Sequence, residues 1–291
     1  MRPQLVAVMG PTASGKTELA EQIAERIDAQ LVNADAFQIY RGMDIGTAKP
    51  DRRDLYRLLD IRNPAEGFGV GEYVALAQEV IQDCWKAERS VVVVGGTGLY
   101  VRALFEEYSQ MGQAPTPELR LSLDEKSLES LVEELQRVEP EAAKGLDLQN
   151  RVRVQRALER IYSPKPSVPV HLPPFQKQKF AVMRDIDDTS ERIKRRTEEM
   201  MRKGWVEEVQ RLKAEGFSLA DPGFRALGYG AIWRTLTGEV ELKEALATTI
   251  AETRRYAKRQ RTWLRSEPNL VILDSDNALE HAMRALSPNI F

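Results

Sequence analysis

The chain has 291 residues, of which 42% are hydrophobic, 30% charged and 7% aromatic. This composition is typical of a globular protein and excludes the disordered, collagen-like and disulfide-scaffold classes. Forty-two Lys and Arg residues against 44 Asp and Glu residues give a net charge of −2, so a basic coat over the whole surface is excluded and any site for a polyanion must be a local patch.

The first third of the chain alternates strands and helices. The apolar run 5–9 predicts a strand buried on both faces, followed by a Gly-rich turn and an amphipathic helix over 19–27. A second strand is expected at 31–34, a second helix at 72–88 and a third strand at 91–94. This order predicts an α/β fold with a P-loop NTPase-like core, in which helices flank a parallel sheet.

From about residue 110 the pattern changes to helices without strands. We interpret 111–179 as a mostly helical insertion domain that contacts the polyanionic partner, and 1–110 with 180–291 as the P-loop core. The apolar run 180–183 predicts the return to the sheet, a helical stretch follows, and 270–273 predicts a last strand. Asp188 and Glu191 have the spacing of a helical capping box.

A P-loop motif, G-x-x-x-x-G-K-[ST], lies between the first strand and the first helix. Its glycines let the backbone curl so that N–H groups meet at one anion, while its lysine adds a mobile charge and its last hydroxyl a ligand for Mg²⁺. The motif predicts that two linked phosphates bind, and it is typical of ATP-binding proteins, but it does not identify the nucleotide. The predicted phosphate-binding residues are Gly10, Pro11, Thr12, Ala13, Ser14, Gly15, Lys16 and Thr17.

A carboxylate, Asp35, follows the second strand, and Thr97 follows the third. Because the carboxyl ends of parallel strands face one crevice, we expect Lys16, Asp35 and Thr97 around a single cavity. The third strand is followed by Gly95 and not by the acid that holds the metal shell of a nucleotide hydrolase. Position alone leaves a second interpretation open, in which Asp35 and Thr97 only cap turns.

A basic ridge is expected on a C-terminal helix over 251–265. Arg254, Lys258, Arg261 and Arg265 fall on one helical face, and apolar residues fall on another. A solvated face is the alternative, but so dense a ridge in a net-acidic protein favours the phosphates of a nucleic acid.

Together these blocks resemble the bacterial tRNA dimethylallyltransferases (tRNA isopentenyltransferases). The matching segments run through nearly the whole chain. They are GPTASGKT at 10–17, DAFQIYRGMDIGTAKP at 35–50, VGGTGLY at 94–100, RVQRALE at 153–159, FRALGY at 224–229 and TRRYAKRQRTW at 253–263.

The resemblance implies a transferase that moves a dimethylallyl group from dimethylallyl diphosphate to N6 of adenosine 37 in tRNA, on the 3′ side of the anticodon. Asp35 is then the general base, and Lys16, Arg225 and Mg²⁺ near Thr17 stabilise the departing diphosphate. The resemblance also implies that Thr97 touches the substrate nucleotide and that Gln38 fixes the target adenine. The implied tRNA contacts are Asp35, Ala36, Phe37, Gln38, Thr97, Arg120, Val152, Arg153, Val154, Gln155 and Arg156, to which the ridge adds Arg254, Lys258 and Arg261.

Four segments depart from the family pattern. Ala36 replaces a serine, Leu55-Tyr56-Arg57-Leu58 lacks a proline and a histidine, Gly230 replaces an arginine, and Leu148 replaces the proline expected before the basic block at 151–156. Three alternatives stay open. The P-loop alone also fits a small-molecule kinase, and the spacing of the P-loop and Asp35 also fits prenyl transfer to a free adenine nucleotide. The lost side chains fit a non-catalytic RNA-binding protein.

The cysteine, histidine and apolar content excludes several further classes of protein. One cysteine and two histidines are too few for a His/Cys zinc site or a Ser-His-Asp or Cys-His hydrolase. No apolar stretch is long enough to cross a membrane, and no secretory signal pattern opens the chain. We therefore expect a cytoplasmic protein, and we expect it to be a monomer. The resemblance implies that its partners are tRNA and dimethylallyl diphosphate.

Overall fold

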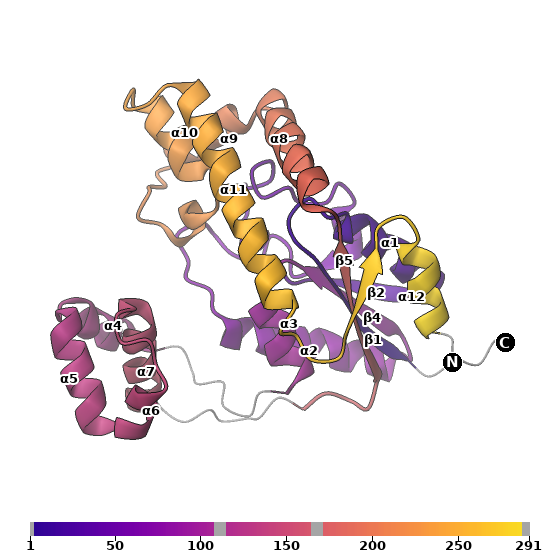
Figure 1. The fold of residues 1–291 in the computed structure, drawn as a ribbon, viewed down its shortest axis with the longest axis horizontal. Helices are drawn as coiled ribbons and strands as arrows, with labels where there is room; N and C mark the ends of the chain where they lie inside the picture. The colour runs from indigo at the N-terminus through magenta and orange to yellow at the C-terminus, as the bar shows by residue number, and fades with distance from the viewer. Residues whose placement is uncertain (1–2, 108–114, 164–170, 287–291) are drawn as a thin grey trace.

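The computed structural model describes residues 3–107, 115–163 and 171–286. Its centre is a six-stranded sheet with the strand order β3-β2-β4-β1-β5-β6, in which every pairing is parallel (Figure 1). The predicted α/β class is confirmed. The strands are β1 (Gln4–Met9), β2 (Ala29–Asn33), β3 (Tyr56–Arg57), β4 (Ser90–Gly95), β5 (Gln176–Met183) and β6 (Leu270–Asp274).

Different helices cover the two faces of the sheet. Alternate residues of β1 pack with α2 and α3 on one face and with α1 and α12 on the other. Successive side chains of a strand point to opposite faces, so a strand covered on both must be apolar throughout, as 5–9 is. The covering helices are α1 (Lys16–Arg26), α2 (Val70–Lys86), α3 (Gly98–Phe105) and α12 (Ala278–Leu286).

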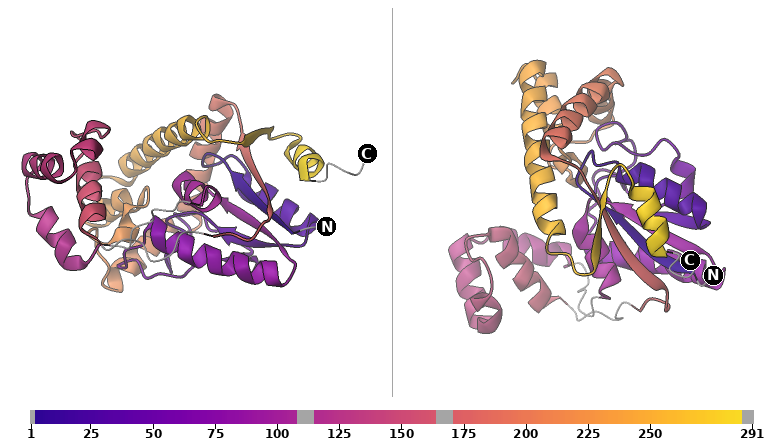
Figure 2. Two further views of the ribbon diagram at one scale, coloured as in Figure 1. Left: turned by 90° about the horizontal axis from the view of Figure 1, so that it is seen from below. Right: turned by 45° about the vertical axis from the view of Figure 1, so that its right-hand side comes forward.

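The C-terminal helices form a second layer that meets the P-loop. Ala13 packs in one small apolar cluster with Ile193 of α8 and Ala257 of α11, and Figures 1 and 2 show α8 and α11 side by side, extending away from the sheet. A further core joins α9 and α10 to the segment that follows β2. The elements are α8 (Ile186–Arg202), α9 (Trp205–Ala214), the 3-10 helix η2 (Pro222–Arg225), α10 (Tyr229–Leu236) and α11 (Leu242–Leu264).

Four further helices pack around a core of their own, with Leu131 and Leu135 fully buried in it. We call them the helical unit; Figure 1 shows it apart from the sheet. Its helices are α4 (Pro117–Asp124), α5 (Leu128–Val138), α6 (Pro140–Lys144) and α7 (Arg151–Tyr162). Residues 111–114 and 164–170 of the predicted insertion lie outside the described ranges, and the division of the chain into domains stays a prediction.

The structure corrects three sequence expectations. β5 begins at Gln176, before the predicted position 180, because it pairs with β1 from Gln4 onward. β3, which the η1 turn (Arg53–Leu55) precedes, was missed because two residues are too few for a periodic pattern. Helix α8 is capped by Asp185, whose side chain accepts from the Asp187 N–H at 2.8 Å, so the capping box expected at Asp188 is wrong.

Candidate active site

The P-loop connects β1 to α1, as the motif predicts. Gly15 caps the helix with a φ of 95°, in the left-handed region that favours glycine. At Gly10 a Cβ atom would lie 2.5 Å from Ser14 Oγ and 2.9 Å from the Val182 carbonyl oxygen, so a side chain there would force the loop open. The first N–H groups of α1 have no helical acceptor and are available to an anion.

Three arginines from around α8 hold the outer side of the P-loop. Arg184 Nε donates to the Ser14 carbonyl at 2.8 Å, and Arg192 Nε donates to the Ala13 carbonyl at 3.0 Å. A third, Arg196, approaches Thr12 Oγ1 at 3.5 Å. Sequence reasoning missed all three, although the four-residue spacing of Arg192 and Arg196 on one helix face was a visible signal.

Burial strongly perturbs the P-loop lysine. Burial first and the Arg196 charge second lower the pKa of Lys16 to about 8, and the Asp35 carboxylate partly opposes them. Burial also lowers the pKa of Arg196. By accessible surface both residues are half-buried. Two such cations close together repel each other, and an anion bound beside them would relieve that repulsion.

Asp35 serves both as a turn residue and as part of the cavity wall. Its Oδ1 accepts from the Phe37 N–H at 3.0 Å, which is the turn-capping role considered from the sequence. Asn33 exchanges hydrogen bonds with its backbone, through side-chain Oδ1 at 3.1 Å and Nδ2 at 3.2 Å. Oδ2 has no hydrogen-bond donor among the described residues, and it would lie 3.7 Å from a Cβ at Gly96. One carboxylate oxygen is therefore left for a substrate.

A cavity of about 910 Å³ lies between the P-loop, the segment after β2, α8 and α11. Lys16, Thr17, Asp35 and Gln38 line it, so the P-loop and the candidate base share one space. Arg225, at the end of η2, is exposed but also lines this cavity. The cavity joins a cationic region to a carboxylate and an amide.

The expectation that Thr97 shares this cavity is wrong. Thr97 lines an adjoining, mostly apolar cavity of about 290 Å³. Gln260 stands between the two, because its Oε1 accepts from the Thr12 N–H at 2.9 Å and its Nε2 donates to the Gly96 carbonyl at 3.0 Å. Thr97 Oγ1 accepts from the Ala36 N–H at 3.0 Å and so fixes the segment that carries Asp35. The two cavities share the wall formed by Gly95, Tyr256, Arg259 and Gln260.

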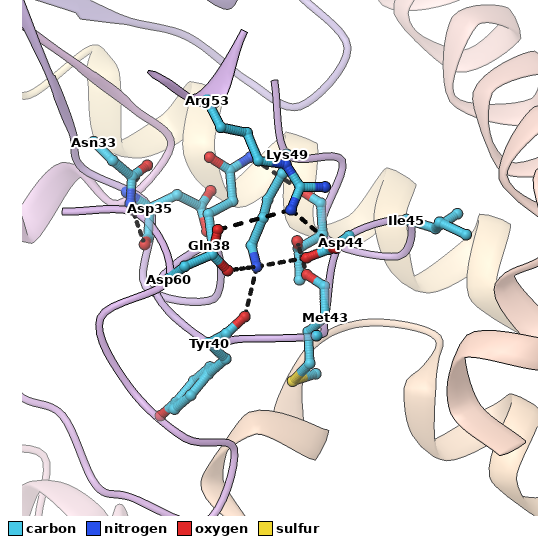
Figure 3. Close-up of polar contacts among 12 residues, drawn as sticks. Asn33, Asp35, Gln38, Tyr40, Met43, Asp44, Ile45, Lys49, Arg53 and Asp60 are labelled. Carbon is cyan, nitrogen blue, oxygen red and sulfur yellow. Dashed lines mark hydrogen bonds and ion pairs between the residues drawn. The ribbon is translucent and has the colours of Figure 1, made fainter. Parts of the chain in front are cut away.

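A buried lysine, Lys49, organises the segment beside Gln38 (Figure 3). Its Nζ donates to the Tyr40 carbonyl at 2.6 Å and to Asp44 Oδ1 at 2.8 Å, and it also pairs with Asp60. Its side chain is fully buried. Sequence reasoning placed this lysine in a family motif but assigned it no role.

The basic ridge is present on α11. Arg254 and Lys258 are exposed, as expected, while Ala257 and Leu264 are buried on the other face. Arg261 is half-buried, and within the described part of the chain its Nε has no hydrogen-bond partner. Binding of tRNA to this ridge stays a prediction.

The predicted tRNA contacts in the helical unit divide into exposed and buried positions. Glu159, almost fully buried, pairs with both Arg120 (3.5 Å) and Arg156 (2.5 Å), whose side chains stay 43% and 58% exposed. Val152 is 66% exposed, and Arg153 is exposed beside a half-buried Gln155. The contact predicted for Val154 is wrong for its side chain, which is fully buried, because consecutive helical residues cannot all face outward.

The residues present suit a magnesium ion that a diphosphate brings with it. Thr17 lines the cavity beside Lys16, and a hydroxyl with phosphate oxygens and water is a donor set that Mg²⁺ accepts. Within the described ranges there is no group of three His, Cys, Asp or Glu residues arranged to hold a metal by themselves. The substrate would therefore have to supply much of the metal's coordination.

Similarity to known proteins extends along almost the whole chain and points to one family. The family described as IPP transferase matches residues 38–267. A tRNA dimethylallyltransferase of Acaryochloris marina is 37% identical over 96% of this chain and 95% of its own length. The tRNA dimethylallyltransferase 1 of Citrifermentans bemidjiense is 39% identical over 93% and 92%.

Solved structures give the same fold. The full-length tRNA isopentenylpyrophosphate transferase of Bacillus halodurans matches with a TM-score of 0.72 and 31% identity, covering 98% of this chain and 96% of that one. A eukaryotic dimethylallyltransferase acting on tRNA reaches a TM-score of 0.83 over 99% and 79% of the two chains, and at 20% identity it supports the fold alone. Among the described helices of this chain, none is long and apolar enough to cross a membrane.

Proposed function

The chain belongs to the IPP transferase family and is a tRNA prenyltransferase, and from that premise we propose that it transfers a dimethylallyl group from dimethylallyl diphosphate to N6 of adenosine 37, releasing diphosphate. The observation that carries this proposal is the single cavity that joins the cationic P-loop to Asp35 and Gln38. A diphosphate and an attacking amine can be held there together.

The P-loop side of the cavity stabilises the leaving group. As the allylic C–O bond breaks, its electron pair goes to the diphosphate oxygen, and negative charge gathers there. The N–H groups at the start of α1, Lys16 and Arg196 face that charge from the wall of the cavity, where partial exclusion of water strengthens electrostatic stabilisation. Arg225 lines the same cavity and is proposed to approach the diphosphate from η2. Bound Mg²⁺ near Thr17 would neutralise further charge.

Asp35 prepares the nucleophile. The exocyclic amine of adenine is weakly nucleophilic because its lone pair is delocalised into the ring. The free Oδ2 of Asp35 takes one N6 proton as the new N–C bond forms, which is general-base catalysis. The adenine of the tRNA must leave the anticodon stack to reach the Asp35 carboxylate. The adjoining apolar cavity offers a surface for the uncharged parts of the substrates.

Two surfaces are proposed to hold the tRNA. The ridge of α11 presents Arg254, Lys258 and Arg261 to the phosphate backbone, and the helical unit presents Arg120 and the exposed positions of 152–156. Glu159 keeps Arg120 and Arg156 in place. We also propose that the enzyme acts as a monomer, in the cytoplasm where tRNA is found.

The test is prenyl transfer with purified protein, Mg²⁺, unmodified tRNA and radiolabelled dimethylallyl diphosphate. We expect label at N6 of a single adenosine next to the anticodon, and loss of the reaction when the metal is chelated. A parallel reaction offers AMP as the acceptor, and label in AMP alone would move the protein to free-nucleotide prenylation. ATP hydrolysis or phosphoryl transfer without prenyl transfer would contradict the proposal.

A further inference from the structure

Glu208 on α9 is a buried carboxylate that the mechanism above does not use. It is 6% exposed, and its oxygens accept from the N–H groups of Asp44 and Ile45 at 2.8 Å each, from the Gly46 N–H at 3.3 Å, and from the Tyr229 hydroxyl at 2.6 Å. Burial and the neighbouring carboxylate raise the pKa of Tyr229 well above its ordinary value, so its hydroxyl stays a donor. A buried charge needs such partners, and Glu208 thereby fixes the backbone of 44–46.

The other end of the same segment is fixed by Lys49. We call residues 44–49 the recognition loop. The buried Lys49 ammonium, at its last residue, pairs with Asp44, its first residue, and ties both to Asp60 and the Tyr40 carbonyl (Figure 3). In the middle of the loop a Cβ at Gly46 would lie 2.1 Å from Trp205 Nε1, so the loop backbone packs directly on α9. Buried charges hold the loop at both ends, and tight packing holds its centre.

The recognition loop presents two carbonyl oxygens to Gln38. Gln38 Nε2 donates to the Thr47 carbonyl at 3.1 Å and to the Ala48 carbonyl at 3.0 Å. Carbonyl oxygens only accept hydrogen bonds, so the end of the amide that faces them must be the NH₂ group. Both amide hydrogens are then used, and what Gln38 can offer a ligand is its acceptor oxygen, Oε1. No described residue donates to that oxygen.

We propose that Glu208 is a positioning residue for base recognition, because through the recognition loop it fixes the Gln38 amide with Oε1 as an acceptor toward the substrate base. This inference rests on the proposed function. An acceptor at this place receives one N6–H of adenine and repels the 6-oxo group of guanine or hypoxanthine. The second N6–H is left for Asp35, which lines the same cavity. Figure 3 shows Gln38 between Asp35 and Lys49.

The test compares anticodon stem-loop RNAs that carry adenosine or inosine at the target position. We expect the wild-type protein to bind the adenosine RNA about tenfold more tightly, the effect of one hydrogen bond exchanged for a repulsion. In Glu208→Gln an NH₂ group replaces one acceptor oxygen and faces the backbone N–H donors of the recognition loop. Because these groups cannot pair, the loop should relax, and the ratio of the affinities for adenosine RNA and inosine RNA should fall toward one. KM for tRNA should rise more than kcat falls, and the affinity for dimethylallyl diphosphate should stay unchanged because the P-loop contacts lie elsewhere.

Glu207→Gln is the matched control, since Glu207 is the neighbouring, exposed acid on the same helix, and it should keep the wild-type ratio. Tyr229→Phe removes one of the four hydrogen bonds to Glu208 and should lower the affinity ratio by a smaller factor. If Glu208→Gln does not fold, Tyr229→Phe tests the inference in its place. A folded Glu208→Gln protein with the wild-type ratio would overturn the inference, and so would a wild-type protein that binds both RNAs equally. A wild-type protein that prefers the adenosine RNA over the inosine RNA but transfers no prenyl group would instead contradict the proposed function.

Discussion

The pKa of Lys16 predicts how substrate binding depends on pH. Burial, reinforced by Arg196, lowers this pKa to about 8, and the protonated ammonium is the form that binds a diphosphate. The favourable charge is therefore present below pH 8 and lost above it. From the protonated fractions at pH 7 and pH 9, the affinity for dimethylallyl diphosphate should fall about tenfold between these values. The phosphates titrate near pH 6 and are already ionised throughout this range.

The assay is isothermal titration of dimethylallyl diphosphate into the protein with Mg²⁺, from pH 6.5 to 9.5. Arg196→Gln removes the neighbouring positive charge, so the midpoint of the decline should move to higher pH. Glu207→Gln, an exposed position on α9, serves as the control and should leave the midpoint where it is. An affinity that stays constant to pH 9.5 would refute the reasoning, because either the lysine is not perturbed or it does not touch the diphosphate.

Three further outcomes are expected. Asp35→Asn should lower kcat by about 10²–10⁴-fold, the range of general-base catalysis, while the dissociation constant for tRNA stays within about threefold of wild type; a parallel loss of tRNA affinity would contradict the base assignment. Neutralising Arg254, Lys258 and Arg261 together should reduce the salt dependence of tRNA binding by up to about two units of slope in a log–log plot, and an unchanged slope would make the ridge a solvated face. Leu131→Ala, fully buried in the helical unit, should destabilise that unit by about 2–5 kcal/mol while the affinity for dimethylallyl diphosphate is retained, measured by thermal denaturation and titration; loss of both properties would contradict an independently folded unit.

Much of the core was predictable because the signals are local. The apolar run 5–9 indicates a doubly covered strand, and the glycines and lysine that follow indicate a turn into a helix. Both the strand and the helix start are confirmed, and the anion site stays a prediction. The face of α11 that carries Arg254 and Lys258 was likewise predictable from the helical period. Such features depend on residues a few positions apart, whose geometry the backbone alone determines.

The details of the site depend on packing between distant segments. Arg184 reaches a P-loop carbonyl 170 residues earlier in the chain, and Gln260 divides the expected single cavity by bridging Thr12 and Gly96. The burial of Val154 follows from the packing of the helical unit around α7. No local pattern in the sequence specifies which of several arginines or glutamines arrives at a given place.

The sequence by itself therefore determined which chemical groups this protein has available: a P-loop with its lysine, a carboxylate after the second strand and a cationic helix. Only the tertiary structure decided how these groups are set, namely a Lys16 whose pKa is lowered by burial and a Gln38 whose acceptor oxygen is left free. The physical reason is that residue type and spacing set which bonds a group can make, whereas desolvation and hydrogen-bond partners depend on how distant segments pack.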